Sequence, residues 1–231
     1  MIRNYDDFVK ALLSAGFSMA SGKGDGIYSI VTWTWNEEPP YETPVRWHTE
    51  DPKTDPWEWR VRVLNERDDI AYGKLFFKKS GFITKEWYPY FLAARRGTAN
   101  FEDFYLQGAM SQTAKSILGL LDEGGKLPVH DIKRIGRFED KPAFERALVE
   151  LQMNMFITVC GSRQKLSKLG IEATNGMASM VYCTTEKFFG KEVFKKAASI
   201  SSETAYGKIR EQILKLNPNA QEKKIQKFIF G

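Results

Sequence analysis

Hydrophobic positions near the start of the chain recur with helical spacing. Phe8, Leu12 and Ala15 fall on one stripe, Asn4 stands where an N-cap is expected, and Gly16 stands where helices commonly end. The pattern predicts one amphipathic helix between Asn4 and Gly16.

Two stretches of alternating residues follow. Ile30 to Trp35 alternates Thr with Val and Trp, and "DPWEWRVRV", residues 55–63, alternates large apolar side chains with charged ones. Asp55-Pro56 is also a helix start, but a helix would divide the Trp and Val side chains between two sides, whereas a strand collects them on one face. We therefore predict two strands here, the second pairing with Ile70 to Phe77 in a Trp-rich β-hairpin.

Helical patterns prevail from residue 84 onwards. A helix is predicted over Thr84 to Arg96, in which Pro89 either distorts the start or marks the true first turn. Capping residues and apolar stripes predict the later elements: helices from Asn100, from Ser111, from Pro128 to Ile135 and from Lys141 to Met153, strands from Phe156 to Cys160 and from Met180 to Thr184, and helices after Thr184.

The order of these elements suggests an α+β protein with a winged-helix domain, because three helices precede two strands that flank a polar loop. All six Trp residues lie at or before Trp87, which favours a boundary near residue 108. We expect a Trp-rich, degenerate winged-helix-like region over 1–108, a winged-helix domain over 109–185, and C-terminal helices over 186–231. If the protein body leaves their apolar stripes uncovered (Tyr206, Ile209, Ile213 and Leu216; Ile225 and Phe228), these helices would form a homodimer surface.

Composition narrows the class of protein only slightly. The chain has 231 residues, 42% of them hydrophobic, which is enough for a real core, and its net charge of +5 gives a mild preference for polyanions. No signal-peptide-like or membrane-spanning apolar run is present, so we expect a cytoplasmic protein with no membrane partner. Cys160, Cys183, His48 and His130 show no ligand spacing, so we expect free thiols and neither a metal nor another cofactor.

Basic side chains of the second half are the candidate nucleic-acid ligands. The loop over residues 161–168 is the candidate wing, and its cations either neutralise phosphates or belong to a solvated turn. The third helix presents Arg146 outwards, but Glu145 and Glu150 flank it and phosphates would repel them, so base-specific reading is doubtful. We expect contacts with double-stranded DNA that ignore base identity, from Lys133, Arg134, Arg137, Arg146, Arg163, Lys165 and Lys168.

Three runs carry a family resemblance: "AYGKLFFKKSGFITKEWYPYFLAARRG", "SILGLLDEGGKLPVHDIKRI" and "FERALVELQMNMFITVCGSRQK". Over roughly residues 45–185 the chain resembles the winged-helix DNA glycosylases called AlkZ or YcaQ, and most closely the shorter AlkZ-related proteins. The resemblance implies a part in DNA repair, since that family removes alkylated or crosslinked bases by hydrolysing the glycosidic bond.

The glycosylase motif itself is missing from the matching place. In those enzymes a Gln-hydrophobic-Gln or Gln-hydrophobic-Asp motif, just after the first helix, holds the attacking water. Here residues 16–21 read GFSMAS and contain neither an amide nor a carboxylate. The nearest similar run, Gln152-Met153-Asn154, closes a helix of a different unit. The resemblance therefore implies a DNA-binding relative without the family's catalytic residues.

Two further functions stay open. A carboxylate among the Trp residues, at Asp55, Glu58 or Glu86, would make the chain an active glycosylase if it replaced the motif beside an aromatic pocket for an extruded base. The same carboxylates equally serve as caps or ion-pair partners. Alternatively the winged helix packs on another protein, as a non-enzymatic interaction or sensor module, which an acidic third helix would suit.

Overall fold

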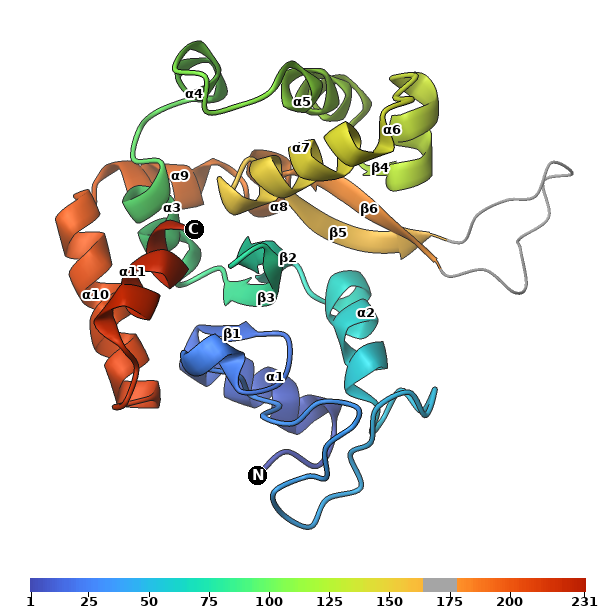
Figure 1. Ribbon diagram of the computed structural model, residues 1–231, viewed down its shortest axis with the longest axis vertical. Coiled ribbons are helices and arrows are strands. Elements are labelled where there is room, and N and C mark those ends of the chain that lie inside the picture. The colour runs from blue at the N-terminus through green and yellow to red at the C-terminus, as the bar shows by residue number, and fades with distance from the viewer. Residues whose placement is uncertain (164–177) are drawn as a thin grey trace, which may run out of the picture.

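A six-stranded antiparallel sheet runs through the protein, which is α+β (Figure 1). The computed structural model describes residues 1–163 and 178–231. The strand order is β1-β3-β2-β5-β6-β4, and β2 meets β5 where Tyr72 faces Val159, so the sheet joins the two halves of the chain. The strands are β1 (Phe17–Met19), β2 (Ile70–Phe76), β3 (Lys79–Thr84), β4 (Leu127–Pro128), β5 (Ile157–Arg163) and β6 (Ser179–Thr184).

Helices cover both faces of this sheet. Several begin at a side-chain cap, with Asn4, Asn100, Ser111 and Asp140 each accepting a hydrogen bond from a backbone N–H of the first turn. The described helices are α1 (Tyr5–Ala15), α2 (Pro56–Glu66), α3 (Tyr88–Arg95), α4 (Phe101–Leu106), α5 (Gln112–Gly124), α6 (Val129–Ile135), α7 (Lys141–Met153), α8 (Thr185–Phe189), α9 (Lys191–Ala198), α10 (Ser202–Leu216) and α11 (Glu222–Phe230), with a short 3-10 turn at Gly24–Gly26.

Three apolar clusters hold the layers together. Helices α3 and α9 to α11 pack on one face of β1, β3 and β2, around Phe76 and Phe228, whose rings stack at 3.9 Å. Helices α1 and α2 pack on the other face, around Phe8 and Trp59. Helices α5 to α7 pack against β5 and β6 around Phe144. Alternation along β2 and β3 sends neighbouring side chains to opposite clusters, as a sheet covered on both faces requires.

The prediction of a strand over residues 57–63 is wrong, because this stretch is helix α2. The carboxylate of Asp55 accepts a hydrogen bond from the backbone N–H of Trp57 at 2.8 Å, and Pro56 opens the first turn. Trp59 enters the core completely, whereas Trp57 is half-buried with the Arg60 guanidinium 3.3 Å above its ring. The Arg60 cation covers Trp57 and the core covers Trp59, so the two rings can lie on different sides of helix α2.

The separate strand expected over Ile30 to Trp35 is also absent. Ile30 to Trp35 has no regular structure, although Val31 and Trp33 are buried. The true partner of β2 is β3, joined to it by the two-residue turn Phe77-Lys78. The helix predicted from Thr84 begins only at Tyr88, with Pro89 in its first turn.

The C-terminal stripes do not form a free dimer surface. Ile209 and Ile213 of α10 and Phe228 of α11 are fully buried in the cluster that includes α3. Because the protein body covers most of these stripes, the structure does not support the homodimer surface expected there. The predicted helices from Ser111 to Met153 and the two strands after them are confirmed, and the expected wing residues Lys165 and Lys168 lie outside the described residues.

Candidate functional site

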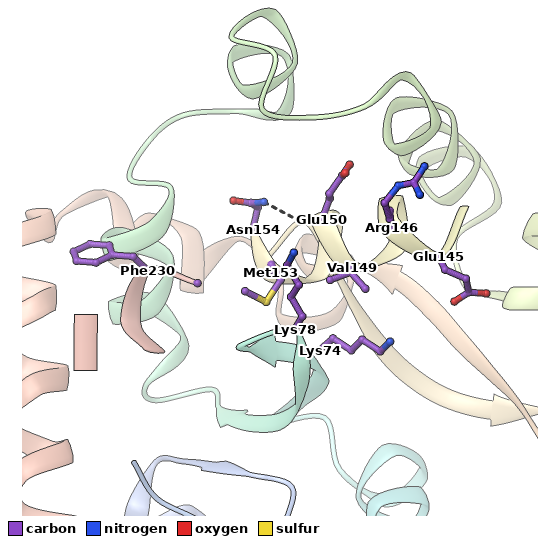
Figure 2. A pocket seen from close by; sticks show the side chains of 10 residues that line it. Lys74, Lys78, Glu145, Arg146, Val149, Glu150, Met153, Asn154 and Phe230 are labelled. Atoms are coloured by element: carbon purple, nitrogen blue, oxygen red, sulfur yellow. Dashed lines mark hydrogen bonds between the residues drawn. The ribbon is translucent and has the colours of Figure 1, made fainter. Parts of the chain in front are cut away.

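A groove of about 450 Å³ runs along the outward side of α7, and we call it the α7 groove (Figure 2). Arg146, Val149 and Met153 of α7 form one wall, and Lys74 and Lys78 approach from β2 and its turn. The lining is completed by Glu145, Glu150, Asn154, Phe230 and Gly231. The groove therefore combines an apolar floor with three cationic side chains.

Helix α7 is held over β2 by Gln152. Its side-chain oxygen accepts a hydrogen bond from the backbone N–H of Lys74 at 2.9 Å, and its amide nitrogen donates to the carbonyl of Leu148 at 2.8 Å. Gln152 is 2% exposed. The close approach depends on Gly73, because a Cβ there would lie 2.8 Å from the same side-chain oxygen. This contact packs the C-terminal half of α7 against the sheet and leaves the N-terminal half, with Arg146, exposed.

Lys78 reaches the groove from a strained turn. Phe77 and Lys78 have φ values of 52° and 60°, and they connect Phe76 to its partner Lys79. Two central residues at positive φ make a type I′ turn, which normally uses Asn and Gly. Phe77 packs on Phe228, with ring centroids 5.9 Å apart, which anchors the turn at the end of the groove.

Both acidic side chains that line the α7 groove already have partners within the protein. Glu145 forms an ion pair of 2.9 Å with Lys133, and Glu150 accepts hydrogen bonds from the hydroxyl (2.8 Å) and the backbone N–H (3.4 Å) of Ser111. Lys74, Lys78 and Arg146 are exposed and form no ion pair with any described residue. The groove therefore offers positive charge to solvent in spite of the two glutamates.

The structure separates the basic residues expected to contact DNA. Lys133 is paired with Glu145 and lies 4.7 Å above the Phe144 ring, and Arg134 is paired with Asp131 at 2.9 Å. Both cations therefore already have a carboxylate partner, although the Arg134 side chain is 73% exposed.

The remaining expected residues lie in three places. Arg137 is exposed after α6 with a φ of 50°, Arg146 lies in the α7 groove, and Arg163 is exposed at the end of β5. Lys165 and Lys168 fall outside the described residues. Lys74 and Lys78 were missed by the sequence analysis, because only the packing of α7 on β2 brings them next to Arg146.

The three candidate catalytic carboxylates have different surroundings. Asp55 is fully buried and accepts hydrogen bonds from the backbone N–H groups of Thr49 (2.8 Å), Glu50 (3.0 Å) and Trp57 (2.8 Å). Glu58 is half-buried on α2, and Glu86 is exposed before α3. An aromatic cavity of about 200 Å³, which we call the α2 cavity, lies beside α2, and none of these carboxylates lines it.

Neither histidine forms a hydrogen bond with a Ser, Thr or Cys side chain among the residues that the structure describes. The His48 ring lies 5.1 Å from that of Trp57, and His130 Nε2 lies 3.9 Å from a carboxylate oxygen of Asp131. Across residues 1–163 and 178–231, no three His, Cys, Asp or Glu side chains gather into a group that would hold a metal ion. None of the described helices combines the length and the apolar character needed to cross a membrane.

Two free cysteines lie on neighbouring strands, Cys160 on β5 and Cys183 on β6. The pKa of the Cys183 thiol is raised because it shares its proton with Cys160 in a hydrogen bond and because it is buried. On β6, burial also raises the pKa of the Tyr182 hydroxyl, and the charge of Glu145 adds to this effect. The Cys183 thiol and the Tyr182 hydroxyl therefore stay protonated at neutral pH, whereas the same hydrogen bond lowers the pKa of the Cys160 thiol.

Comparison with known proteins gives one match. The sequence model of the family described as AlkZ related matches residues 2–230. No curated protein and no solved structure matches the chain. Since the match covers nearly the whole chain, the protein belongs to the AlkZ-related family.

Proposed function

We propose that this protein binds double-stranded DNA through the sugar–phosphate backbone, using the cations of the α7 groove, and that it acts in DNA repair without hydrolysing the glycosidic bond itself. The observation that carries the proposal is that Lys74, Lys78 and Arg146 line one exposed groove beside the third helix of a three-helix unit. Membership of the AlkZ-related family supports DNA as the polyanion.

The order of elements supports a winged-helix domain over residues 109–185, with residues 1–108 and 186–231 as the flanking regions. Helix α5, strand β4, helices α6 and α7, and the β5–β6 pair follow one another, and β4 pairs with β6. Ala114, Ile132 and Phe144 share one core across the three helices. In winged-helix proteins the third helix and the hairpin loop approach the duplex.

The packing of α7 supports contacts with phosphates over reading of bases. Gln152 faces β2 and Met153 lines the α7 groove, so this part of the helix is already covered. The helix therefore does not present its whole outer surface to the major groove of DNA. Glu145 remains on the exposed N-terminal half, where it disfavours close approach to base edges flanked by phosphates. Arg146, Lys74 and Lys78 then position DNA without regard to its sequence.

The surroundings of the carboxylates favour binding over catalysis. All three hydrogen bonds of Asp55 come from backbone N–H groups, which stabilise the turn before α2 and leave this side chain with a structural task. Neither Glu58 nor Glu86 lines the α2 cavity, although this cavity has several aromatic walls. A water-activating base would need to stand beside such a space.

A salt titration tests the proposal. Binding to a fluorescent duplex is measured by anisotropy from about 50 mM to about 200 mM salt, where each phosphate contact contributes about −0.9 to the slope of log K against log salt. We expect Lys74→Ala and Arg146→Ala each to weaken binding and to reduce the slope by about 0.9. Lys208→Ala is the matched control, because Lys208 is exposed on α10 and away from the α7 groove.

Two results would contradict the proposal. If the duplex does not bind, or if its affinity is indifferent to salt, the groove is not a phosphate-binding surface and a protein partner becomes the better explanation. The second result is that the purified protein releases a base from alkylated or crosslinked DNA and that Glu58→Gln or Glu86→Gln abolishes this activity. The protein would then be a glycosylase with a substitute carboxylate.

A further inference from the structure

Five aromatic side chains line the α2 cavity: Phe8, Trp47, Trp57, Tyr72 and Phe82, with the Tyr72 and Phe82 rings 4.9 Å apart. Ala20, Ser21, Val31, Pro56, Arg60 and Ser80 complete the lining. Trp47 is fixed by a hydrogen bond from its indole N–H to the carbonyl of Trp33 at 3.2 Å. The volume is about 200 Å³, and an apolar protein cavity of about 150 Å³ already holds one benzene ring.

Arg60 is the only charged side chain among the described residues that line this cavity. Its guanidinium carbon lies 3.3 Å from the centre of the Trp57 ring, so the group is held in place by stacking. The Nε–H of Arg60 is buried and has no hydrogen-bond acceptor among the described residues. A buried donor without an acceptor is costly, and the Arg60 side chain forms no hydrogen bond with any described residue, so no protein group competes with an anion for this cation.

No described carboxylate neutralises Arg60 from within the cavity. The nearest basic neighbour on the same helix, Arg62, is different, because it forms a 3.0 Å ion pair with Glu66. A planar carboxylate is the group that fits an Arg side chain best, since it accepts two parallel hydrogen bonds from the guanidinium. Ser21 and Ser80 add hydroxyl groups to the same lining.

We propose that the α2 cavity binds a small aromatic carboxylate, with one ring between the aromatic side chains and the carboxylate paired to Arg60. The ring gains burial against Trp57 and Tyr72, and the carboxylate neutralises a guanidinium that lines the cavity and forms no ion pair with a described residue. The site is separate from the α7 groove, so it provides a second ligand for the protein and does not depend on DNA binding.

Calorimetry on the full chain without DNA tests this site, with benzoate, benzamide and acetate as probes. Benzamide has nearly the shape of benzoate but no charge, and acetate has the charge without the ring. We expect benzoate to bind at least about 10-fold more tightly than benzamide, because charge-assisted bonds to Arg are about twice as strong as neutral ones, and acetate to show no saturable binding.

Three variants assign the effect to the cavity. Arg60→Gln should remove the preference for benzoate over benzamide, whereas Arg62→Gln on the same helix should leave it unchanged. Ala20→Leu should block both ring compounds, because Ala20 lines the cavity and the added side chain fills it while Arg60 remains. The substitution at Ala20 leaves the hydrogen bond from its backbone N–H to the Ser80 carbonyl in place. Ala20→Leu therefore still tests the site if Arg60→Gln does not fold.

Several outcomes would overturn the proposal. These are equal affinity for benzoate and benzamide, no saturable binding of either compound, or an Arg60→Gln protein that keeps the benzoate preference. The DNA titration described above is unaffected by any of them, so failure of this site is distinguishable from failure of the proposed function.

Discussion

The side chain of Gln152 on α7 accepts a hydrogen bond from the backbone N–H of Lys74 on β2, over a distance of 2.9 Å and a separation of 78 residues. The bond joins the three-helix unit to the hairpin that carries Lys74 and Lys78. One buried amide therefore sets the spacing between the two sides of the α7 groove.

Replacement of Gln152 by Met should destabilise the protein. Met has a similar shape but only a weakly accepting sulfur, so the Lys74 N–H would lose its strong acceptor in a part-buried place. We expect the free energy of unfolding to fall by about 1–3 kcal/mol, measured by denaturant unfolding. Gln226→Met is the control, because Gln226 is exposed on α11 and should change stability by less than about 0.5 kcal/mol. Equal stability of wild type and Gln152→Met would show that the bond does not hold α7 in place.

Asp55→Ala should also destabilise the protein, for a different reason. The substitution removes the N-cap of α2 and leaves the N–H groups of Thr49, Glu50 and Trp57 without their acceptor. We expect a loss of about 2 kcal/mol or more in the free energy of unfolding. Glu58→Ala, on the first turn of the same helix, should leave stability nearly unchanged, because the Glu58 carboxylate accepts no hydrogen bond from a described residue. If Asp55→Ala is as stable as wild type, the Asp55 carboxylate has no structural role, and it becomes a candidate catalytic residue again.

Local signals were enough to predict α4 to α7. Asn100 and Ser111 each precede a helix, and their side chains cap it as the sequence suggests. The apolar stripe through Phe144 and Leu151 is the buried face of α7. Caps and stripes act within a few residues, so they are visible without knowledge of the fold.

The error at α2 has a physical origin. Over residues 57–63 the spacing of Trp and Val fits a strand, and the assumption behind that prediction was that all large apolar groups share one buried face. In the structure only Trp59 and Val63 of this stretch enter the core, while Trp57 stacks with Arg60 and makes a tilted contact with His48 at the edge of the core. A cation can cover an aromatic ring as well as a core can, and a hydrophobic pattern does not distinguish the two.

The candidate site was predictable only in part. Arg146 could be placed on the outward face of its helix from periodicity alone. Lys74 and Lys78 could not be placed beside it, because their position depends on the pairing of β2 with β5 and on Gln152, which are contacts between distant parts of the chain. Likewise the ion pair of Lys133 with Glu145 depends on how α6 and α7 pack.

Alkaline pH should destabilise the protein through Tyr5. Burial, with the charge of Glu66 as a second cause, raises the pKa of the Tyr5 hydroxyl from 10.0 to about 12. The unfolded chain releases this proton first, so the free energy of unfolding falls as pH rises from about 10 to about 12. We expect Tyr5→Phe to lose less stability than wild type over this range, since it keeps the ring but has no proton to release. Parallel stability curves for the two proteins would contradict this assignment.

Lys78→Gly should make the protein more stable and weaken its binding to DNA. Lys78 occupies the second central position of a type I′ turn with a φ of 60°, where a side chain is strained and Gly is not. Relief of this strain should raise the free energy of unfolding by about 0.5–1 kcal/mol. The same change removes one cation of the α7 groove, so the slope of log K against log salt should fall by about 0.9.

Lys78→Ala separates these two effects, because alanine removes the charge but keeps a Cβ at positive φ. The alanine and glycine variants should therefore lose the same DNA affinity, measured by anisotropy, while only the glycine variant gains stability in denaturant unfolding. If both variants bind DNA as wild type does, Lys78 contacts no phosphate and the groove ends at Lys74. If both are equally stable, Phe77 packing on Phe228 leaves no strain at Lys78 for glycine to relieve.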